Sequence, residues 1–491
     1  MNREIKDIND EFIVSVYCGP QPPIKVDGVE YPDRINDEQF LLLKDLGVNL
    51  TYGQCDIMNS PTERYAFAAM EICSRIGMGY LVKDQISREY CSLGKEFKGY
   101  TYKDYRTLTE DEKKELDERF KKSILRYKDY QSFKGLIFVD EPGTEMFDGI
   151  QRAYNVFKSV YPEKLFLVNH LPYNTHSRDF QFSAWQDDGK AKLNDEFEFK
   201  LDKSKSNYDG FYVHNIIEKY ELYLDEFFTR INDGVYSWDL YPFRDWYGFN
   251  TLVMRGLYEM PLIANKFCKK YGLKYWIFLQ CGGMWDAHAK VTTFSDVQLS
   301  VSLALALGAK GIQLYTGCFP NDCLPKKAER SGVIDEYGRT TNQYDFYKYA
   351  IRQLKAVEQY LVSAEFKGVI LAGEYLDRTP SVEKLKELDV TDIYKGKFPI
   401  YGDYEKNTPY NEIVEVIADY QVLVSCFEKG GRTMYMIVNT SPVVFTSVTV
   451  KFNSNYNIKL VQAGETICLE SERIDIRNLP AGENVLLEIE K

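Results

Sequence analysis

The sequence predicts an α/β fold, a (β/α)₈ or TIM barrel, followed by a small all-β domain of the sandwich type. Two observations predict this architecture. Eight short apolar runs alternate with long helical segments along the first part of the chain, whereas strand-like segments with no helical period fill the rest. We therefore place the barrel at residues 1–364 and the β-sandwich domain at residues 365–491.

The eight apolar runs contain few polar residues, as expected for parallel strands that are buried on both faces. They lie at residues 12–17, 48–53, 79–84, 135–140, 164–169, 234–239, 274–280 and 311–316. An open doubly wound sheet is the alternative, but no glycine-rich phosphate loop follows the first run. The barrel is therefore the favoured arrangement.

Helical segments are expected between these runs and after the last of them. They lie at residues 61–76, 109–129, 145–160, 208–231, 248–271, 292–308 and 341–363. In the first segment Pro61 follows Ser60, which predicts Ser60 as the N-cap. Segments 85–108 and 171–207 remain as long loops, and such loops after strands are where barrel active sites are built.

In the second domain, strands are expected in four segments. They lie at residues 420–428, 433–441, 445–452 and 483–490. The sequence EKGGRT between the first two predicts a hairpin turn. No strand face carries three aromatic residues, so we expect this domain to have a structural role.

Composition excludes several classes of protein. The chain has 491 residues and a net charge of −12, so nucleic acid is not an expected partner. No apolar run reaches the roughly 18 residues of a membrane span, and the charged N-terminus lacks a secretory signal. We therefore expect a cytoplasmic protein with no membrane partner.

Metal and cofactor chemistry is not expected either. The ten cysteines are scattered without C-x-x-C pairs, and the chain has four histidines. The nearest approach to a cysteine cluster is Cys318 and Cys323, and we interpret the cysteines as reduced, mostly buried thiols. We expect no metal site and no cofactor.

Aromatic residues make up 15% of the chain, with 38 Tyr and 29 Phe. Most of them are expected to pack in the core. Tyrosine and tryptophan also stack on the apolar faces of sugars while offering a polar group, so the excess favours a carbohydrate ligand.

The fourth predicted strand ends in two adjacent acids, Asp140 and Glu141, followed by Pro142. The carboxyl ends of barrel strands surround the active site. Adjacent strand residues point to opposite sides, so both acids can face the site only if the chain turns there, and Pro142 disfavours a helical conformation at Glu141. The alternative role for one acid is to cap the helix predicted at 145–160.

Other strand ends also carry polar or aromatic residues. The sixth strand ends in Trp238 and Asp239, with Tyr241 two residues later; the alternative for Asp239 is a buried ion pair with Arg244. Candidate substrate-binding residues at these and the remaining strand ends are Asp84, Asn169, His170, Trp238, Tyr241, Gln280, Trp285 and Tyr315.

Glycoside hydrolysis fits this set of residues. The reaction needs a protonated carboxyl beside the leaving oxygen and a second group near the anomeric carbon. Glu141 is the natural acid, because apolar walls and the neighbouring Asp140 would raise its pKa.

Three segments resemble the clan of (β/α)₈ glycoside hydrolases that includes the family 42 β-galactosidases. They are GLIFVDEPG, the small-residue helix before GAKGIQLYT, and GVIDEYGRTTNQY, and the resemblance covers about residues 10–365. It implies that Glu141 is the acid/base. The clan carries its nucleophilic glutamate at the end of strand seven, where this chain has Gln280, which cannot form a glycosyl ester.

Three explanations remain open. Asp239 or Asp286 could replace the nucleophile. Alternatively, Asp140 and Glu141 are similar to the acid pair of the family 20 and 123 hexosaminidases, in which the first acid orients the substrate acetamide. Gln280 or Tyr241 would then hold the acetamide.

The third explanation is a barrel that binds sugar without cleaving it. An imine-forming lyase that uses Lys83 is a further alternative. We favour a hydrolase of small oligosaccharides or glycosides, with Glu141 as acid/base. Homo-oligomers are common among such enzymes, although the sequence shows no interface.

Overall fold

The barrel prediction is confirmed. The computed structural model describes residues 11–53, 57–94, 96–97, 100–172, 211–243, 250–283, 291–321, 324, 332–373 and 412–490. Eight parallel strands close into a barrel in the order β1-β12-β11-β10-β9-β8-β5-β4. Each strand overlaps one predicted apolar run. They are β1 (Ile13–Val16), β4 (Leu50–Tyr52), β5 (Gly79–Val82), β8 (Phe133–Asp140), β9 (Leu165–His170), β10 (Val235–Asp239), β11 (Lys274–Gln280) and β12 (Gly311–Tyr315).

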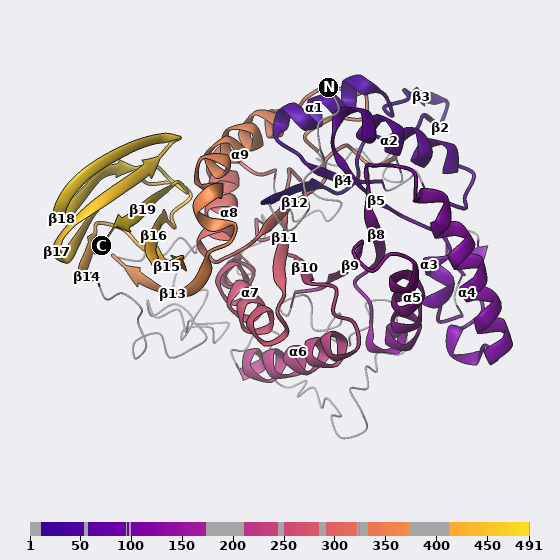
Figure 1. Cartoon of the computed structure of the whole chain (residues 1–491). Coiled ribbons are helices and arrows are strands. Elements are labelled where there is room, and N and C mark those ends of the chain that lie inside the picture. The colour runs from indigo at the N-terminus through magenta and orange to yellow at the C-terminus, as the bar shows by residue number, and fades with distance from the viewer. Residues whose placement is uncertain are drawn as a thin grey trace.

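Helices surround the barrel (Figure 1). They are α1 (Asp37–Leu46), α2 (Glu63–Ile76), α3 (Ser87–Tyr90), α4 (Glu110–Ile124), α5 (Phe147–Val160), α6 (Phe211–Arg230), α7 (Asn250–Tyr271), α8 (Phe294–Ala306) and α9 (Asn342–Leu361). Short 3-10 helices lie at Tyr105–Thr107, Leu125–Tyr127 and Thr144–Met146. Two small hairpins complete the described loops: β2 (Ile24–Val26) with β3 (Val29–Tyr31), and β6 (Glu96–Phe97) with β7 (Tyr100–Thr101).

Two helix starts differ from the sequence analysis. Helix α1 was not among the predicted segments, although Asn36 caps it by accepting from the Gln39 N–H at 3.1 Å. The N-cap predicted at Ser60 is wrong, because α2 begins at Glu63 and Thr62 precedes it. The Ser60 hydroxyl instead donates to the Ile57 carbonyl at 2.6 Å and stabilises the turn before the helix.

Side chains of the barrel strands alternate between two cores. Inward-facing residues, such as Leu167 on β9 and Phe278 on β11, form a core inside the barrel. Outward-facing residues, such as Val168 and Leu279, belong to the larger core between the strands and the helices. This alternation determines which polar residues at the strand ends reach the interior.

The second domain is a seven-stranded antiparallel sheet that folds over on itself. Its strands are β13 (Glu365–Ala372), β14 (Ile413–Ala418), β15 (Val422–Lys429), β16 (Arg432–Asn439), β17 (Thr446–Gln462), β18 (Glu465–Leu479) and β19 (Asn484–Glu490). A register shift between Lys451 and Tyr456 divides β17, whose first half pairs with β14 and whose second half pairs with β19. Apolar residues of both halves share one core, as in a sandwich.

The predicted hairpin is confirmed between β15 and β16. Lys429 pairs with Arg432, and Gly430 and Gly431 between them have φ values of 57° and 80°. A two-residue turn of this kind needs positive φ at both positions, which glycine adopts without steric cost. Strands β13, β14 and β18 were not among the predicted segments.

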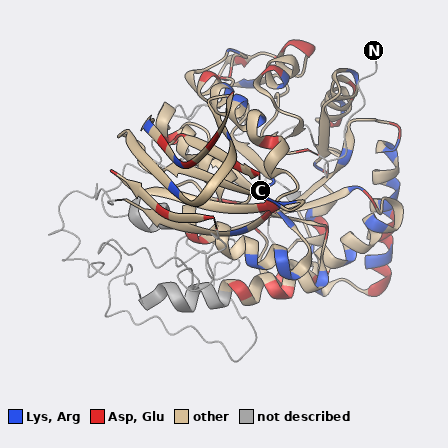
Figure 2. Ribbon diagram, turned by 60° about the vertical axis from the view of Figure 1, so that its left-hand side comes forward, with Lys and Arg blue, Asp and Glu red and all other residues tan. Residues whose placement is uncertain are grey.

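The β domain packs on the helices α8 and α9 of the barrel (Figure 1). Asn484 donates to the Ser302 hydroxyl at 2.8 Å, and Tyr349 donates to Glu483 at 3.1 Å. Basic and acidic residues are interspersed over the helices in Figure 2. Among the described helices, none combines the length and apolar character needed to cross a membrane.

Candidate active site

Three carboxyl groups gather at the carboxyl ends of β8 and β10. Asp140 is the last residue of β8, Glu141 follows it, and Asp239 is the last residue of β10. Asn169 on β9 lies between them, and its Nδ2 donates to Asp140 Oδ1 at 3.0 Å and to Asp239 Oδ1 at 3.4 Å. The carboxyl of Glu141 is within hydrogen-bonding reach of Asp239. The structure therefore brings the three predicted catalytic acids together.

An irregularity in β8 directs Asp140 to the interior. The register with β9 shifts between Ile137 and Val139, so Phe138 and Val139 both pack on the outer core. Strict alternation from Ile137, which faces the interior, would have turned Asp140 outward. The bulge adds one residue and re-aims the acid.

Glu141 turns the chain at the strand end. Its φ is 50°, in the left-handed region, and its backbone N–H donates to the Asn169 carbonyl at 2.8 Å. A non-glycine residue in this conformation costs about 1–3 kcal/mol and persists only where surrounding contacts hold it. The turn lets two adjacent acids approach the same region.

Two buried residues hold the peptide that follows Glu141. The Tyr223 hydroxyl donates to the Pro142 carbonyl at 2.9 Å, and His170 Nδ1 lies 2.9 Å from the same hydroxyl. Because the Tyr223 hydroxyl donates its proton to the Pro142 carbonyl, His170 Nδ1 must be the donor in its hydrogen bond to the Tyr223 oxygen. Burial lowers the pKa of His170 to about 3, so the ring is neutral. Both residues thus support the turn that carries Glu141.

The acids are electrostatically coupled. Burial and then the charge of Asp140 raise the pKa of Asp239 to about 8, against the opposing hydrogen bonds from Asn169 and Glu141. The pKa of Asp140 is also raised, because the surrounding protein reduces the hydration of its carboxyl, while the Asn169 amide and the Lys83 cation oppose the shift. The cluster therefore retains a proton at neutral pH.

Asp140 lies at the carboxyl end of the barrel. Its side chain is solvent-exposed, yet surrounding protein limits its hydration and raises its pKa. Three aromatic rings lie near it: the Tyr315 ring is 5.6 Å from that of Tyr17 and 5.2 Å from that of Tyr241, measured between centroids, and the charge of Asp140 acts on Tyr17 and Tyr241. Lys83 Nζ lies 3.5 Å from the Tyr17 hydroxyl. This arrangement offers stacking surfaces, a cation and carboxyl groups to a small polar ligand.

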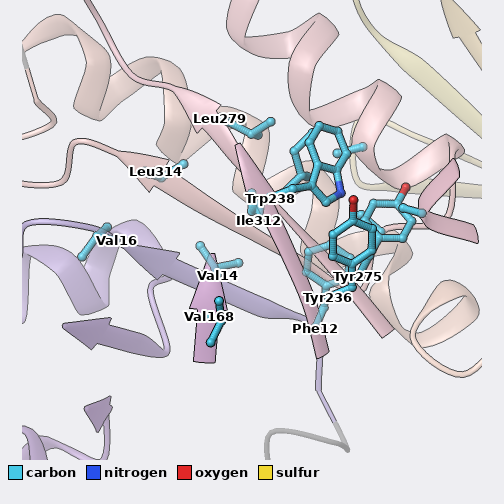
Figure 3. Close-up of a cluster of buried hydrophobic side chains, with 14 of the residues drawn as sticks. Phe12, Val14, Val16, Val168, Tyr236, Trp238, Tyr275, Leu279, Ile312 and Leu314 are labelled. Atoms are coloured by element: carbon cyan, nitrogen blue, oxygen red, sulfur yellow. The ribbon is translucent and has the colours of Figure 1, made fainter. Parts of the chain in front are cut away.

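Three of the predicted substrate-binding residues lie elsewhere. His170 packs outward against α6, 4.5 Å from the Phe227 ring. Trp238 is fully buried in the core between strands and helices, beside Tyr275 (Figure 3). Asp84 accepts hydrogen bonds from residues of its own loop and of α4 and is buried. His170 and Trp238 thus point away from the barrel interior, and the carboxylate of Asp84 is taken up by donors of the protein.

Gln280 is engaged by the backbone of another loop. Its Oε1 accepts from the Phe243 N–H at 3.0 Å, and its Nε2 donates to the Phe243 carbonyl at 3.0 Å. A carboxylate could not make the second bond, so glutamine suits this position. Gln280 thereby fixes the loop that carries Tyr241. Trp285, Asp286, Arg244 and Cys323 lie outside the described residues.

Sequence analysis missed several polar residues of the barrel interior. Tyr17, Tyr52, Ser237 and Gln313 all point inward, and strand alternation would have identified them. Among the described residues, no group of three or more His, Cys, Asp or Glu is placed to hold a metal ion. The eight described cysteines form no disulfide with one another, and Cys318 is buried.

The fold and site define a (β/α)₈ barrel with coupled carboxyl groups at its carboxyl end. No protein-family model and no curated protein sequence matches the chain. A solved β-galactosidase from Bacillus circulans sp. alkalophilus is similar, with a TM-score of 0.52 and 12% identity over 98% of this chain and 100% of that chain. A glycoside hydrolase family 5 structure from Bacteroides vulgatus has a TM-score of 0.47 and 12% identity, over 97% and 88%. At such identities the likeness concerns the fold.

Proposed function

We propose that the protein is a glycoside hydrolase in which Glu141 donates the proton to the leaving oxygen. One observation carries the proposal: Glu141 lies against Asp239, whose pKa is raised to about 8, so the pair holds a proton at neutral pH. General acid catalysis of glycoside cleavage requires such a proton. The structural likeness to a β-galactosidase and the aromatic rings near Asp140 support the same class of reaction.

Asp239 is proposed to store the proton and not to attack the sugar. Acid and nucleophile of a retaining enzyme stand about 5–5.5 Å apart, and those of an inverting enzyme about 6.5–9.5 Å apart. Two carboxyl groups within hydrogen-bonding reach leave no room for a sugar ring between them. The group near the anomeric carbon is therefore Asp140 or the substrate itself.

A 2-acetamido sugar is the substrate we favour. One oxygen of Asp140 accepts from Asn169, and the residue is solvent-exposed, so its carboxylate can accept an acetamide N–H. Tyr241 belongs to the same aromatic group as Tyr315, and burial raises its pKa well above its usual range, so its hydroxyl keeps its proton and can donate to the acetamide oxygen. The acetamide oxygen would then attack the anomeric carbon, and no protein nucleophile would be needed.

The test compares wild type with Glu141→Gln on matched aryl glycosides. The pairs carry the same sugar with 2-acetamido or 2-hydroxy groups. We expect cleavage of the acetamido member, and a loss of about 10²–10⁴-fold in kcat with Glu141→Gln when the leaving group is poor. The exposed acid Glu118 provides the matched control, Glu118→Gln. A Glu141→Gln variant with the full wild-type rate would refute the assignment.

A barrel that binds sugar without cleaving it remains the second candidate. The observation that favours it is the engagement of Gln280, in the position of the clan nucleophile, by the backbone of Phe243. Calorimetric binding of a sugar by wild type, with no turnover on any member of the panel, would decide for this candidate.

A further inference from the structure

A chain of four buried side chains crosses the barrel interior and ends at the acids. The Tyr52 hydroxyl donates to Gln313 Oε1 at 2.9 Å, and Gln313 Nε2 donates to Ser237 Oγ at 2.8 Å. Ser237 donates to Asn169 Oδ1 at 2.9 Å, and Asn169 Nδ2 donates to Asp140 at 3.0 Å. The four side chains come from β4, β12, β10 and β9, so the chain connects opposite parts of the barrel.

Every hydrogen bond in this chain has its direction fixed by the carboxylate end. An ionised Asp140 only accepts, so Asn169 must present its NH₂ group and turn its oxygen to Ser237. Ser237 therefore donates to Asn169 and accepts from the Gln313 NH₂ group. The Gln313 oxygen then faces Tyr52, whose hydroxyl proton completes the series. Removal of the tyrosine hydroxyl would take away the donor that Gln313 Oε1 now has in a buried position.

We propose that Tyr52, Gln313 and Ser237 are positioning residues that set the acidity of the carboxyl cluster by holding the amide of Asn169 toward it. Donation from Asn169 stabilises the ionised form of Asp140 and Asp239. Hydrogen bonds in series polarise one another, and all four residues are buried, where solvent does not replace a lost donor. The proposal concerns the same site as the proposed hydrolase and deepens it.

Other groups around the acids are also accounted for. Lys83 opposes the upward shift in the pKa of Asp140, and the carboxyl of Glu141 contacts Asp239. The surrounding tyrosines have pKa values raised by burial and stay neutral near pH 7; they are Tyr17, Tyr52, Tyr220, Tyr223 and Tyr241. None of these tyrosines competes with the carboxyl groups for the titrating proton in that range.

The experiment measures the carboxyl titration in Tyr52→Phe and Ser237→Ala beside wild type. Protonated carboxyl groups are followed by infrared difference spectroscopy against pH, with Asp239→Asn as the reference that assigns the band. We expect the apparent pKa to rise by about one unit in Ser237→Ala and by about half a unit in Tyr52→Phe. The ordering follows from the distance of each residue from Asn169 along the chain.

The matched control is Tyr275→Phe. The Tyr275 hydroxyl is also buried and donates to the Leu307 carbonyl at 2.7 Å, but it lies outside the barrel interior. A merely structural role for Tyr52 predicts that both Tyr→Phe variants lose similar stability and leave the carboxyl titration unchanged, and that result would overturn the inference. If wild type cleaves no glycoside but the titration shifts as expected, the proposed function fails and the inference stands.

Discussion

Two acids at the carboxyl end of the barrel, Asp84 and Asp239, have similar burial and opposite surroundings. Asp84 is 2% exposed and Asp239 is 6% exposed. The Asp84 carboxylate accepts hydrogen bonds from four donors at 2.6–3.0 Å, which are Asn59 Nδ2, the Ile86 N–H, the Ser123 hydroxyl and the Tyr127 hydroxyl. An acid whose oxygens are saturated by donors of the protein is a structural residue.

Asp239 receives much less support. The amide of Asn169 reaches it at 3.4 Å and is shared with Asp140, and Glu141 stands beside it as a further acid. Burial and then the charge of Asp140 raise the pKa of Asp239 to about 8, and the few hydrogen bonds that it receives do not offset them. The comparison shows that burial alone does not distinguish a structural acid, whose oxygens are satisfied by donors, from an acid that can hold a proton.

Asp84→Asn tests the structural side of this comparison and has the largest expected effect on stability. The amide would turn an NH₂ group toward the Ser123 and Tyr127 hydroxyls, which now donate to the carboxylate. We expect the free energy of unfolding to fall by about 2–4 kcal/mol, measured by urea denaturation. The control is Asp111→Asn, whose side chain is 95% exposed. Equal stability of the two variants would contradict the structural assignment.

Asp239→Asn tests whether Asp239 holds an extra proton, through the pH dependence of the free energy of unfolding. The folded pKa of about 8 lies above the unfolded value near 4, so the folded state binds more protons between these values. Wild-type stability therefore falls as pH rises through this window, and the fall ends above pH 8. The variant lacks this contribution, so its stability relative to wild type should increase from pH 5 to pH 8 by about 1–3 kcal/mol.

The measurement is urea denaturation of wild type and Asp239→Asn at several pH values. Asp111→Asn serves again as the control, because it makes the same substitution at a side chain that is 95% exposed. A difference between wild type and Asp239→Asn that stays constant from pH 5 to pH 8 would show that Asp239 does not hold the extra proton.

The sequence was sufficient to predict the barrel, because parallel strands that are buried on both faces appear in it as short apolar runs. It was also sufficient for Asp239 and Asn169, which alternate inward with the rest of β10 and β9. The same rule assigns His170 and Trp238 to the outer side, where the structure places them. A histidine and a tryptophan at strand ends had suggested sugar binding, but the alternation of side chains along each strand directs both residues outward.

The alternation of side chains along a strand does not predict the directions of Asp140 and Glu141. A bulge at Phe138 reverses the alternation before Asp140, and a left-handed φ of 50° turns Glu141. Both features depend on register with β9 and on contacts from α6, which are far apart in sequence. Likewise, the sequence predicted only the first half of β17. The two halves pair with different strands across a register shift, which depends on residues far apart in sequence.

Tyr223→Phe has the smallest expected effect and tests how Glu141 is held. The carboxylate of Asp84 is positioned by donors on its own oxygens, whereas Glu141 depends on the backbone around it. Loss of the hydroxyl releases the Pro142 carbonyl and leaves His170 Nδ1 without its acceptor. The strained turn should then relax in part, which we expect to lower kcat about 5–10-fold, with KM little changed.

The matched control for this variant is Tyr161→Phe. The Tyr161 hydroxyl is part of a buried bond as well, donating to the Ile124 carbonyl at 3.1 Å, and Tyr161 lies at the C-terminal end of α5. A general loss of packing would lower stability in both variants and spare kcat in both. A selective fall in kcat with Tyr223→Phe identifies the hydroxyl as the support of the Glu141 turn. Equal kcat in the two variants would mean that Asn169, through its bond to the Glu141 N–H, holds the turn alone.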